Sequence, residues 1–470
     1  MIGAGMPYLR AMRRLFFLLV LLSPSLYAQH LQWVSSSAAA PWAAQPAIAE
    51  GPGGAVTLSV DTVTRLQTIE GFGGCFNELG WKALRRLSAA DRAAVVRELF
   101  APGVGAGFTL CRMPVGANDF SDGWYSYDET AGDLTLSHFS IARDLGSLVP
   151  FIHAAQHVNP RLQLWASPWS PPSWMKVNGH YACAGTSAGG EGIDLFRVED
   201  PYLKAYAQYF VRFVKAYKAQ GITIGMVMPQ NEFNSCQVFP SCTWTAASLT
   251  RFVGGYLGPA LQPLGVKLFF GTMERANTAL ADSLLRDPAC ARYIRGVGFQ
   301  WAGKGAIAGI HRRYPGLDLY QSEQECGDGK NGWDYAAYTW SLMKHYISGG
   351  ARAYMYWNLA LDEGGISHWG WTQNSLVTVD TLRHTYRYTP DYYVFKHLTH
   401  FVRPGARLVG YSGSSAEQSL CFLNRDGSVV VVIGNPDTSP RPVRIAIGRH
   451  FFSATLPPSS FHTFIFNKAA

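Results

Sequence analysis

Two glutamates in this sequence stand where apolar runs end. Glu232 closes the run 222–232 (ITIGMVMPQNE), and Glu323 closes the run 317–323 (LDLYQSE). A single acid at the end of a strand is usually a solvated surface residue. Two acids on opposite sides of one cleft can cleave a glycosidic bond, because one protonates the leaving oxygen while the other attacks the anomeric carbon or activates water. The pair therefore predicts sugar hydrolysis if the fold brings the two run ends together.

The order of strands and helices indicates how these ends meet. Strand-like apolar runs alternate with helical periods, including a helix capped by Ser88 and another that ends at Gly349. Eight β/α units that close on themselves form a TIM barrel, whose active site lies at the carboxyl ends of the strands. Glu232 and Glu323 then end the fourth and seventh strands. The predicted strands are 64–74, 107–115, 162–168, 222–232, 266–272, 294–301, 317–323 and 351–358.

A second domain follows the predicted barrel. The chain has 470 residues, 48% of them hydrophobic, which is enough for one large domain and a smaller companion. We expect an α/β fold with the (β/α)8 TIM barrel over 66–398. Short strands separated by turns such as Asp426-Gly427 predict a fused β-sandwich over 399–470, and residues 29–65 supply strands that join it.

The first 28 residues have the layout of a secretory signal peptide. Three arginines precede an apolar run over 15–22, and the small residue Ala28 follows. Eight apolar residues are too few to span a bilayer, and no later run reaches the roughly 20 that a membrane helix needs. We expect an exported protein, periplasmic or extracellular, without stable membrane insertion. The net charge of +8 comes without a basic run or basic helix face, so no nucleic-acid partner is expected.

Polar and aromatic residues at other strand ends suit a sugar pocket. Trp169 follows the third predicted strand and Trp357 ends the eighth, and sugar rings stack on such indoles. A buried core tryptophan is the competing interpretation for each. Asn231 can hydrogen-bond a sugar hydroxyl or simply form a turn. Arg112 and Asp119, after the second strand, can clamp hydroxyls or form a structural salt bridge.

Other chemistries fit the sequence less well. Residues 185–189 (GTSAG) match a nucleophile elbow but follow a polar loop instead of a strand. His153 and His157 lie four apart on a predicted helix, where a solvated face is the simpler interpretation. The glycines at 303, 305 and 309 lack the spacing of a dinucleotide loop. We expect neither a metal nor an organic cofactor.

The chain contains eight cysteines and no CxxC pair, so a zinc site is weakly supported. If a disulfide forms, Cys236 and Cys242 are the best-placed pair, because they flank a short loop-like stretch. Cys75 and Cys111 lie in apolar segments and are expected to be buried thiols.

Six ordered motifs resemble glycoside hydrolase family 30, which includes glucosylceramidases, β-1,6-glucanases and some β-xylosidases. They are IEGFGGCFNE, RMPVGANDFS with YSYDE, ASPWSPPSWMKVNG, PQNEF, SEQECGDGKNGW and YWNLALDEGG, and they span roughly residues 66–400. The closing segment SFHTFIF also resembles the sandwich strand of that family.

The resemblance implies a retaining mechanism on β-linked sugars, with Glu232 as acid/base and Glu323 as nucleophile. It places Glu325 just beyond the nucleophile, where this acid either tunes its neighbour or faces solvent. By the same matching, the pocket for the sugar at the cleavage point would be lined by Arg112, Asp119, Trp169, Asn231 and Trp357.

Two departures bear on the substrate. The glucosylceramidases carry His-Trp-Tyr after the sixth strand, where this chain has Gln300, Trp301 and Ala302, and Phe233 replaces a proline after the acid/base. We count Gln300 among the substrate-binding candidates. Trp369 and Trp371, in the loop after the eighth strand, are expected to form a platform for the leaving group.

The sequence thus predicts an exported β-glucosidase resembling the glucosylceramidases. A β-1,6-glucanase or β-xylosidase with the same catalytic residues is the alternative, and a non-catalytic carbohydrate-binding barrel is less favoured. The sequence leaves the oligomeric state open.

Overall fold

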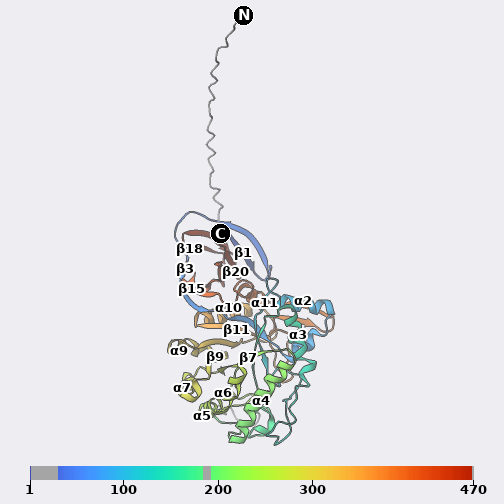
Figure 1. Ribbon diagram of the computed structural model, residues 1–470. Coiled ribbons are helices and arrows are strands. Elements are labelled where there is room, and N and C mark those ends of the chain that lie inside the picture. The colour runs from blue at the N-terminus through green and yellow to red at the C-terminus, as the bar shows by residue number, and fades with distance from the viewer. Residues whose placement is uncertain (2–29, 184–191, 468–470) are drawn as a thin grey trace.

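The computed structural model describes Met1 and residues 30–183 and 192–467. Most of the predicted signal peptide and the segment 185–189 lie outside these residues. Eight parallel strands close into a barrel in the order β10-β11-β4-β5-β6-β7-β8-β9, so the predicted TIM barrel is confirmed (Figure 1). The strands are β4 (Gly71–Cys75), β5 (Leu110–Pro114), β6 (Gln163–Ser167), β7 (Ile224–Val227), β8 (Lys267–Met273), β9 (Ile294–Gln300), β10 (Asp318–Glu323) and β11 (Ala351–Asn358).

Helices between the strands cover the barrel. Helix α2 begins after Ser88, whose side chain accepts a hydrogen bond from the Asp91 N–H, and α10 ends at Gly349, both as predicted. The larger helices are α1 (Glu78–Leu84), α2 (Ala89–Phe100), α3 (Leu148–Val158), α4 (Asp200–Ala219), α5 (Ala246–Phe252), α7 (Thr278–Arg286), α9 (Ile307–Arg313), α10 (Trp333–Ser348) and α11 (Pro390–Thr399).

One predicted helix is interrupted. The apolar period over 245–261 indicates a helix, and in the structure α5 passes into a π-helical turn over Val253–Leu257 before the short α6 (Gly258–Leu261). Gly254, Gly255 and Pro259 explain the break, because glycine weakens a helix and proline removes a backbone donor.

The sandwich domain is built on a nine-stranded sheet in the order β19-β18-β3-β15-β16-β17-β20-β1-β2. Three of its strands come from the N-terminal part of the chain, so the two ends of the polypeptide share one sheet (Figure 1). The strands are β1 (His30–Ser36), β2 (Ala43–Ala49), β3 (Leu58–Thr68), β15 (Arg407–Ser412), β16 (Ser419–Leu423), β17 (Val429–Asn435), β18 (Arg441–Ile447), β19 (His450–Leu456) and β20 (Ser460–Phe466).

The single strand predicted over 64–74 is wrong. Strand β3 stays in the sandwich sheet to Thr68, and β4 begins in the barrel at Gly71. The chain passes from one domain to the other at Ile69 and Glu70, so a continuous apolar pattern hides a change of sheet.

Helices α10 and α11 lie between the barrel and the sandwich sheet (Figure 1). On α11, the buried His397 ring contacts the Thr463 hydroxyl at 2.8 Å and the Ser36 hydroxyl at 2.7 Å. Among the described residues, no helix has the length and apolar character to cross a membrane.

Candidate active site

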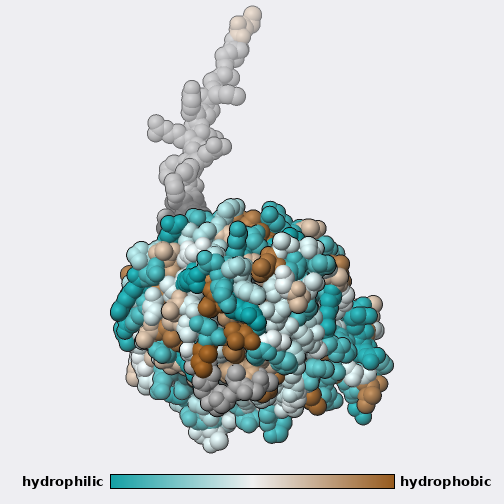
Figure 2. All heavy atoms as spheres, turned by 90° about the horizontal axis from the view of Figure 1, so that it is seen from below, coloured by the Kyte–Doolittle hydropathy of each residue, from teal (hydrophilic) through white to brown (hydrophobic). Residues whose placement is uncertain are grey.

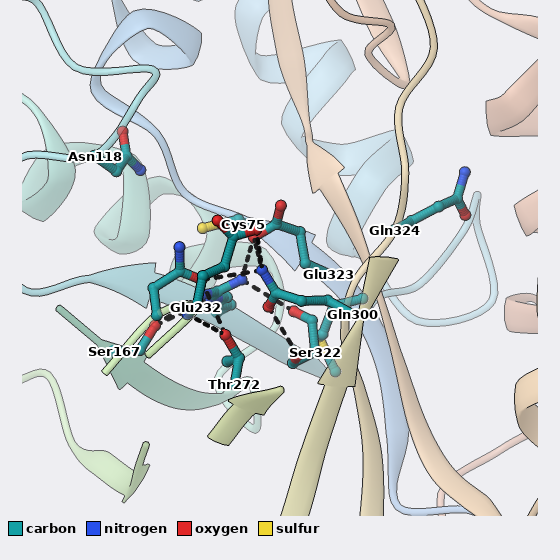
Figure 3. Close-up of polar contacts among 12 residues, drawn as sticks. Cys75, Asn118, Ser167, Glu232, Thr272, Gln300, Ser322, Glu323 and Gln324 are labelled. Atoms are coloured by element: carbon teal, nitrogen blue, oxygen red, sulfur yellow. Dashed lines mark hydrogen bonds and ion pairs between the residues drawn. The ribbon is translucent and has the colours of Figure 1, made fainter. Parts of the chain in front are cut away.

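The two predicted acids meet at the carboxyl end of the barrel. Glu323 is the last residue of β10, and Glu232 follows β7, and each is 5% exposed. One amide bridges them: Gln300 Nε2, at the end of β9, lies 3.1 Å from Glu232 Oε1 and 3.3 Å from Glu323 Oε2 (Figure 3). The two carboxylate oxygens therefore lie no farther apart than the sum of these two distances.

Arg112 on β5 anchors the Glu323 side of the site. Its guanidinium donates to Glu323 Oε2 at 2.6 Å, to Asn231 Oδ1 at 2.7 Å and to Ser167 Oγ at 2.8 Å. The side chain is fully buried. The salt bridge considered from the sequence thus exists, but its acid is Glu323 itself.

The two predicted tryptophans form a packed wall. Trp169 and Trp357 are 1% exposed, and their rings stack with centroids 5.2 Å apart. The Arg112 guanidinium lies 4.3 Å from the Trp169 ring centre and 5.4 Å from that of Trp357. The structure therefore combines both interpretations of these residues, since each indole is buried and each also borders the carboxylate pair through Arg112.

Asn231 and Asp119 complete the predicted set. Asn231 Oδ1 accepts hydrogen bonds from Arg112 and from Thr272 Oγ1 at 3.1 Å, and Gln300 Nε2 lies 3.1 Å away. Asp119 is buried, and its burial, followed by the nearby charge of Glu323, raises its pKa well above the usual value for an aspartate. All the predicted site residues thus gather at one end of the barrel.

The surroundings of the two acids are electrostatically unequal. Burial, then the negative charge of Glu323, raises the pKa of Glu232 well above its usual value. Burial also raises the pKa of Glu323, but Arg112 and hydrogen bonds from Trp301 and Gln300 oppose that rise. A single proton shared by the pair is therefore held by Glu232, and Glu323 carries the negative charge.

Glu325 and Gln324 turn away from this site. Glu325 pairs with Lys304 at 2.6 Å and accepts from the Tyr338 hydroxyl at 2.8 Å. Gln324 donates to Thr339 Oγ1 at 2.8 Å and points away from the acids (Figure 3). Of the two acids in the SEQEC stretch, only Glu323 enters the site.

The backbone at Glu232 is held in an unusual conformation. Its φ is 48°, a left-handed value that side-chain-bearing residues seldom adopt. The Glu232 N–H donates to Thr272 Oγ1 at 2.9 Å, and the neighbouring Asn231 N–H donates to Pro168 O at 2.7 Å. Such local strain persists where surrounding contacts fix it, and it often marks a functional site.

Several residues of the site were not anticipated. Trp301 Nε1 donates to Glu323 Oε1 at 3.1 Å, and the Ser322 hydroxyl donates to Gln300 Oε1 at 3.0 Å, which fixes the orientation of the bridging amide. Ser167 and Thr272 contact Arg112 and Glu232, as described above. All four of these residues lie at or next to strand ends, namely Ser167, Thr272, Trp301 and Ser322. A search of every strand end for polar side chains would therefore have found them.

The predicted Cys236–Cys242 disulfide is wrong. Cys242 is a fully buried thiol, and its Sγ donates to the Thr243 carbonyl oxygen. The Cys242 side chain belongs to the hydrophobic core, which its place near a loop-like stretch did not indicate. Cys75 and Cys111 are buried thiols, as expected.

The structure gives no support to the histidine pair or the glycine cluster as sites. His153 and His157 lie on the exposed side of α3, and His153 contacts the Gln220 carbonyl oxygen at 2.7 Å. Gly303 and Gly305 lie in a 3-10 turn after β9. Within residues 30–183 and 192–467, no group of three or more His, Cys, Asp or Glu side chains is arranged to hold a metal.

Comparison with known proteins identifies the same two-domain arrangement. Residues 69–402 match the Glycosyl hydrolase family 30 TIM-barrel domain, and residues 405–464 match the Glycosyl hydrolase family 30 beta sandwich domain. The mouse lysosomal acid glucosylceramidase is 28% identical over 449 residues, covering 88% of this chain and 84% of the relative.

A fungal relative and a solved structure extend the comparison. An endo-1,6-beta-D-glucanase from Neurospora crassa is 29% identical over 396 residues, with 79% of each chain covered. The crystal structure of SrfJ from Salmonella typhimurium superposes with a TM-score of 0.84 at 26% identity, covering 94% of this chain and 100% of SrfJ.

Proposed function

We propose, from the premise that this chain belongs to glycosyl hydrolase family 30 and is a glycosidase, that it cleaves β-glucosidic bonds with retention of configuration. Glu323 is the nucleophile and Glu232 is the acid/base. The observation that carries the proposal is the Gln300 bridge between the two carboxyl groups. It allows the roughly 5–5.5 Å separation of the two carboxyl groups that retaining enzymes have.

In the first step the Glu323 carboxylate attacks the anomeric carbon and forms a glycosyl-enzyme ester. The bond from that carbon to the leaving oxygen breaks, and the leaving oxygen takes the proton of Glu232. Arg112 and Trp301 support this step, because they hold Glu323 in its charged form and fix its orientation.

In the second step water hydrolyses the ester. Glu232, now a carboxylate, removes a proton from the water as its oxygen bonds to the anomeric carbon, and Glu323 leaves as a carboxylate. This returns the proton to Glu232. The changing charge of Glu323 supports the cycle, because loss of that charge in the ester lowers the pKa of Glu232 when it must act as a base.

The pocket for the sugar at the cleavage point is formed by Asp119, Asn231 and the Trp169–Trp357 wall. We propose glucose as this sugar, on the analogy of the glucosylceramidase and β-1,6-glucanase relatives. The protein is also proposed to be exported, since residues 1–28 have the pattern of a signal peptide.

A β-1,6-glucanase is the second candidate, and an open rim supports it. In the loops beyond β6, β7 and β11, Val177, Val238 and Trp371 are 60%, 61% and 40% exposed. The Phe239 and Trp371 rings meet edge to face with centroids 5.8 Å apart. Apolar side chains gather on one face of the molecule in Figure 2. Such a rim suits a large leaving group, either a further sugar or an apolar one.

The test is product release by the mature protein from an aryl β-glucoside, an aryl β-xyloside and a linear β-1,6-glucan. We expect glucose from the aryl glucoside, and NMR should detect the β-anomer of the product first. Glu323→Ala should abolish turnover and leave sugar binding in place. First appearance of the α-anomer would contradict retention, and activity on the xyloside or glucan alone would replace the proposed substrate.

A further inference from the structure

The two oxygens of Glu232 face different partners. Oε1 points inward to the bridging amide of Gln300, whereas Oε2 accepts a hydrogen bond of 3.4 Å from Gln237 Nε2. The inward oxygen thus lies on the side of Glu323, where the sugar must bind. The outward oxygen faces the loop that carries Gln237.

Gln237 belongs to the loop that follows Glu232 and forms part of the rim. Its neighbour Val238 is exposed, and Phe239 packs against Trp371 of the loop beyond β11. Gln237 itself is half-buried. Its amide is therefore placed between the buried acid and the surface over which a leaving group must pass.

The backbone of this loop is firmly held. The Gln237 carbonyl oxygen accepts from the Cys183 N–H at 2.9 Å and from Ser241 Oγ at 3.1 Å. The buried Lys176 ammonium donates to the Ser241 carbonyl at 2.5 Å and to that of Tyr181 at 2.9 Å. Two loops are thus joined beneath Gln237, so its side chain reaches Glu232 from a fixed base.

The two hydrogen bonds of the Gln237 amide differ in length. The bond to Ser235 Oγ is 2.6 Å, near the short limit for such contacts, whereas the bond to Glu232 Oε2 is at the long limit. The long bond is the weaker one and is the one that an incoming oxygen atom can replace. The amide then keeps its bond to Ser235 and has a free N–H beside the leaving group.

We propose that Gln237 is a positioning residue for the acid/base and a determinant of leaving-group specificity. Building on the proposed function, Gln237 fixes the orientation of the Glu232 carboxyl group through Oε2 until the glycosidic oxygen of the substrate replaces this hydrogen bond. It then donates its N–H to a hydroxyl or ether oxygen of the leaving group. Leaving groups with an oxygen near the scissile bond, such as a second sugar, benefit from this contact.

The kinetic test compares Gln237→Ala with the wild type on aryl β-glucosides of graded leaving-group acidity. For a phenol leaving group with a pKa of about 10, which needs full protonation, kcat/KM should fall about tenfold. For dinitrophenol, which departs without a proton, kcat/KM should stay unchanged. A uniform loss over the series would overturn the proposal, since a merely structural defect would slow every substrate alike.

A second measurement does not depend on turnover. Because the Gln237 amide favours the carboxylate form of Glu232, its removal should raise the Glu232 pKa in a carbon-13 NMR titration of labelled glutamate. Gln237→Glu should raise it further through like-charge repulsion. An unchanged Glu232 pKa in both variants would overturn the inference even if the substrate proposed above is wrong.

Gln45→Ala is the matched control. Gln45 is also half-buried and donates to a serine hydroxyl, Ser35 Oγ at 2.9 Å, but it lies on β2 of the sandwich. Its substitution should change neither the leaving-group dependence nor the Glu232 titration.

Discussion

At the scale of single residues, the site depends on an asymmetry between two buried glutamates. Arg112 and Trp301 donate to Glu323, Gln237 donates to Glu232, and the Gln300 amide contacts both acids. A cation stabilises a carboxylate more than an amide does. This difference assigns the charge to Glu323 and the proton to Glu232, which is the state in which a retaining reaction begins.

The raised pKa of Glu232 predicts the basic limb of the pH profile. In the proposed mechanism kcat/KM requires protonated Glu232, so activity should persist above the usual glutamate pKa of 4.5 and decline as pH rises through the elevated value. Glu232→Gln should remove this limb for a dinitrophenyl glucoside. It should also lower kcat/KM for a phenyl glucoside by about 10²- to 10⁴-fold. Retention of the basic limb in the variant would assign it to another group.

Arg112 should control the acidic limb. Arg112→Lys keeps a positive charge but cannot reach Glu323, Asn231 and Ser167 together, so kcat should fall about 10- to 100-fold. Weaker stabilisation of the carboxylate raises the Glu323 pKa, which moves the acidic limb of kcat/KM to higher pH. The control is Arg143→Lys, in which the substituted arginine pairs with Glu78 at 2.9 Å instead of a site acid. An acidic limb that stays fixed in Arg112→Lys would contradict this role.

At the scale of elements, a chain of buried amides connects the ends of strands around the barrel mouth. Asn118 donates to Asn77 at 2.7 Å, Asn77 to Asn358 at 2.7 Å, and Asn358 to Gln373 at 3.1 Å. The chain joins the loop after β5, the end of β4, the end of β11 and the loop beyond β12 (Ala360–Asp362). Asn118 precedes Asp119 and Asn358 follows Trp357, so these amides fix two sides of the proposed sugar pocket.

Breaking this chain should affect both stability and substrate binding. Asn358→Ala leaves the Asn77 donor and the Gln373 acceptor unpaired, which should cost about 2–4 kcal/mol in the free energy of unfolding. KM for an aryl glucoside should rise, because Trp357 loses its fixed neighbour. The measurements are urea unfolding and steady-state kinetics.

Asn159→Ala provides the matched control for the amide chain. Asn159 is also buried and donates to Phe108 O at 2.8 Å, but it lies at the amino-terminal end of the barrel. A loss of stability with KM unchanged is expected there. If Asn358→Ala behaved in the same way, the chain would have only a structural role.

A second buried cluster predicts how stability depends on pH. Asp144 accepts hydrogen bonds from the hydroxyls of Tyr125, Tyr127 and Tyr217 at 2.8, 2.6 and 2.5 Å. Burial nevertheless raises its pKa from 3.8 to about 6. The contribution of this group to folding is therefore fully present below its unfolded pKa and is lost as pH rises through about 6.

Asp144→Asn should remove that dependence. Between about pH 4 and 6, the slope of unfolding free energy against pH should change by up to about 1.4 kcal/mol per unit relative to the wild type. Chemical denaturation at several pH values measures this slope. Parallel slopes for the two proteins would show that Asp144 does not titrate in this range.

At the scale of the whole molecule, the barrel and the sandwich are joined through α10 and α11. Besides the His397 contacts, Lys396 on α11 pairs with Glu98 on α2 at 2.6 Å, and its ammonium lies 4.6 Å from the Trp42 ring centre. On the other helix, the Trp340 ring packs close to Gly434 of β17, where an added Cβ would lie 2.5 Å from Trp340 Nε1. The two domains should therefore unfold together.

Gly434→Ala tests this shared interface. The added methyl group must displace the buried Trp340 ring, which should cost about 1–3 kcal/mol. Calorimetry should show one transition at a lower temperature, because both domains lose the contact at once. Gly146→Ala, where the methyl group meets open space, should leave the transition unchanged. Two separated transitions in the wild type would contradict cooperative unfolding.

The sequence by itself determined the barrel, the sandwich strands and both acids at the strand ends. These features follow from local patterns: apolar periodicity, N-caps such as Ser88, and the position of a charged residue where an apolar run stops. The resemblance of six motifs then indicated the glycoside hydrolase family 30. The same local patterns gave a wrong strand end near Thr68, where β3 ends without a change of pattern. They also gave a wrong disulfide partner for Cys242, whose thiol is buried.

Only the tertiary structure decided which way the side chains at these ends point. Arg112 and Glu323 are 211 positions apart, and Gln300 joins acids from two other strands, so no local pattern records these contacts. Glu325 lies only two residues from Glu323 but pairs with Lys304 instead, and no local pattern records this contact either. Strand formation depends on near neighbours, whereas the protonation and orientation of the acids depend on residues that only barrel closure brings together.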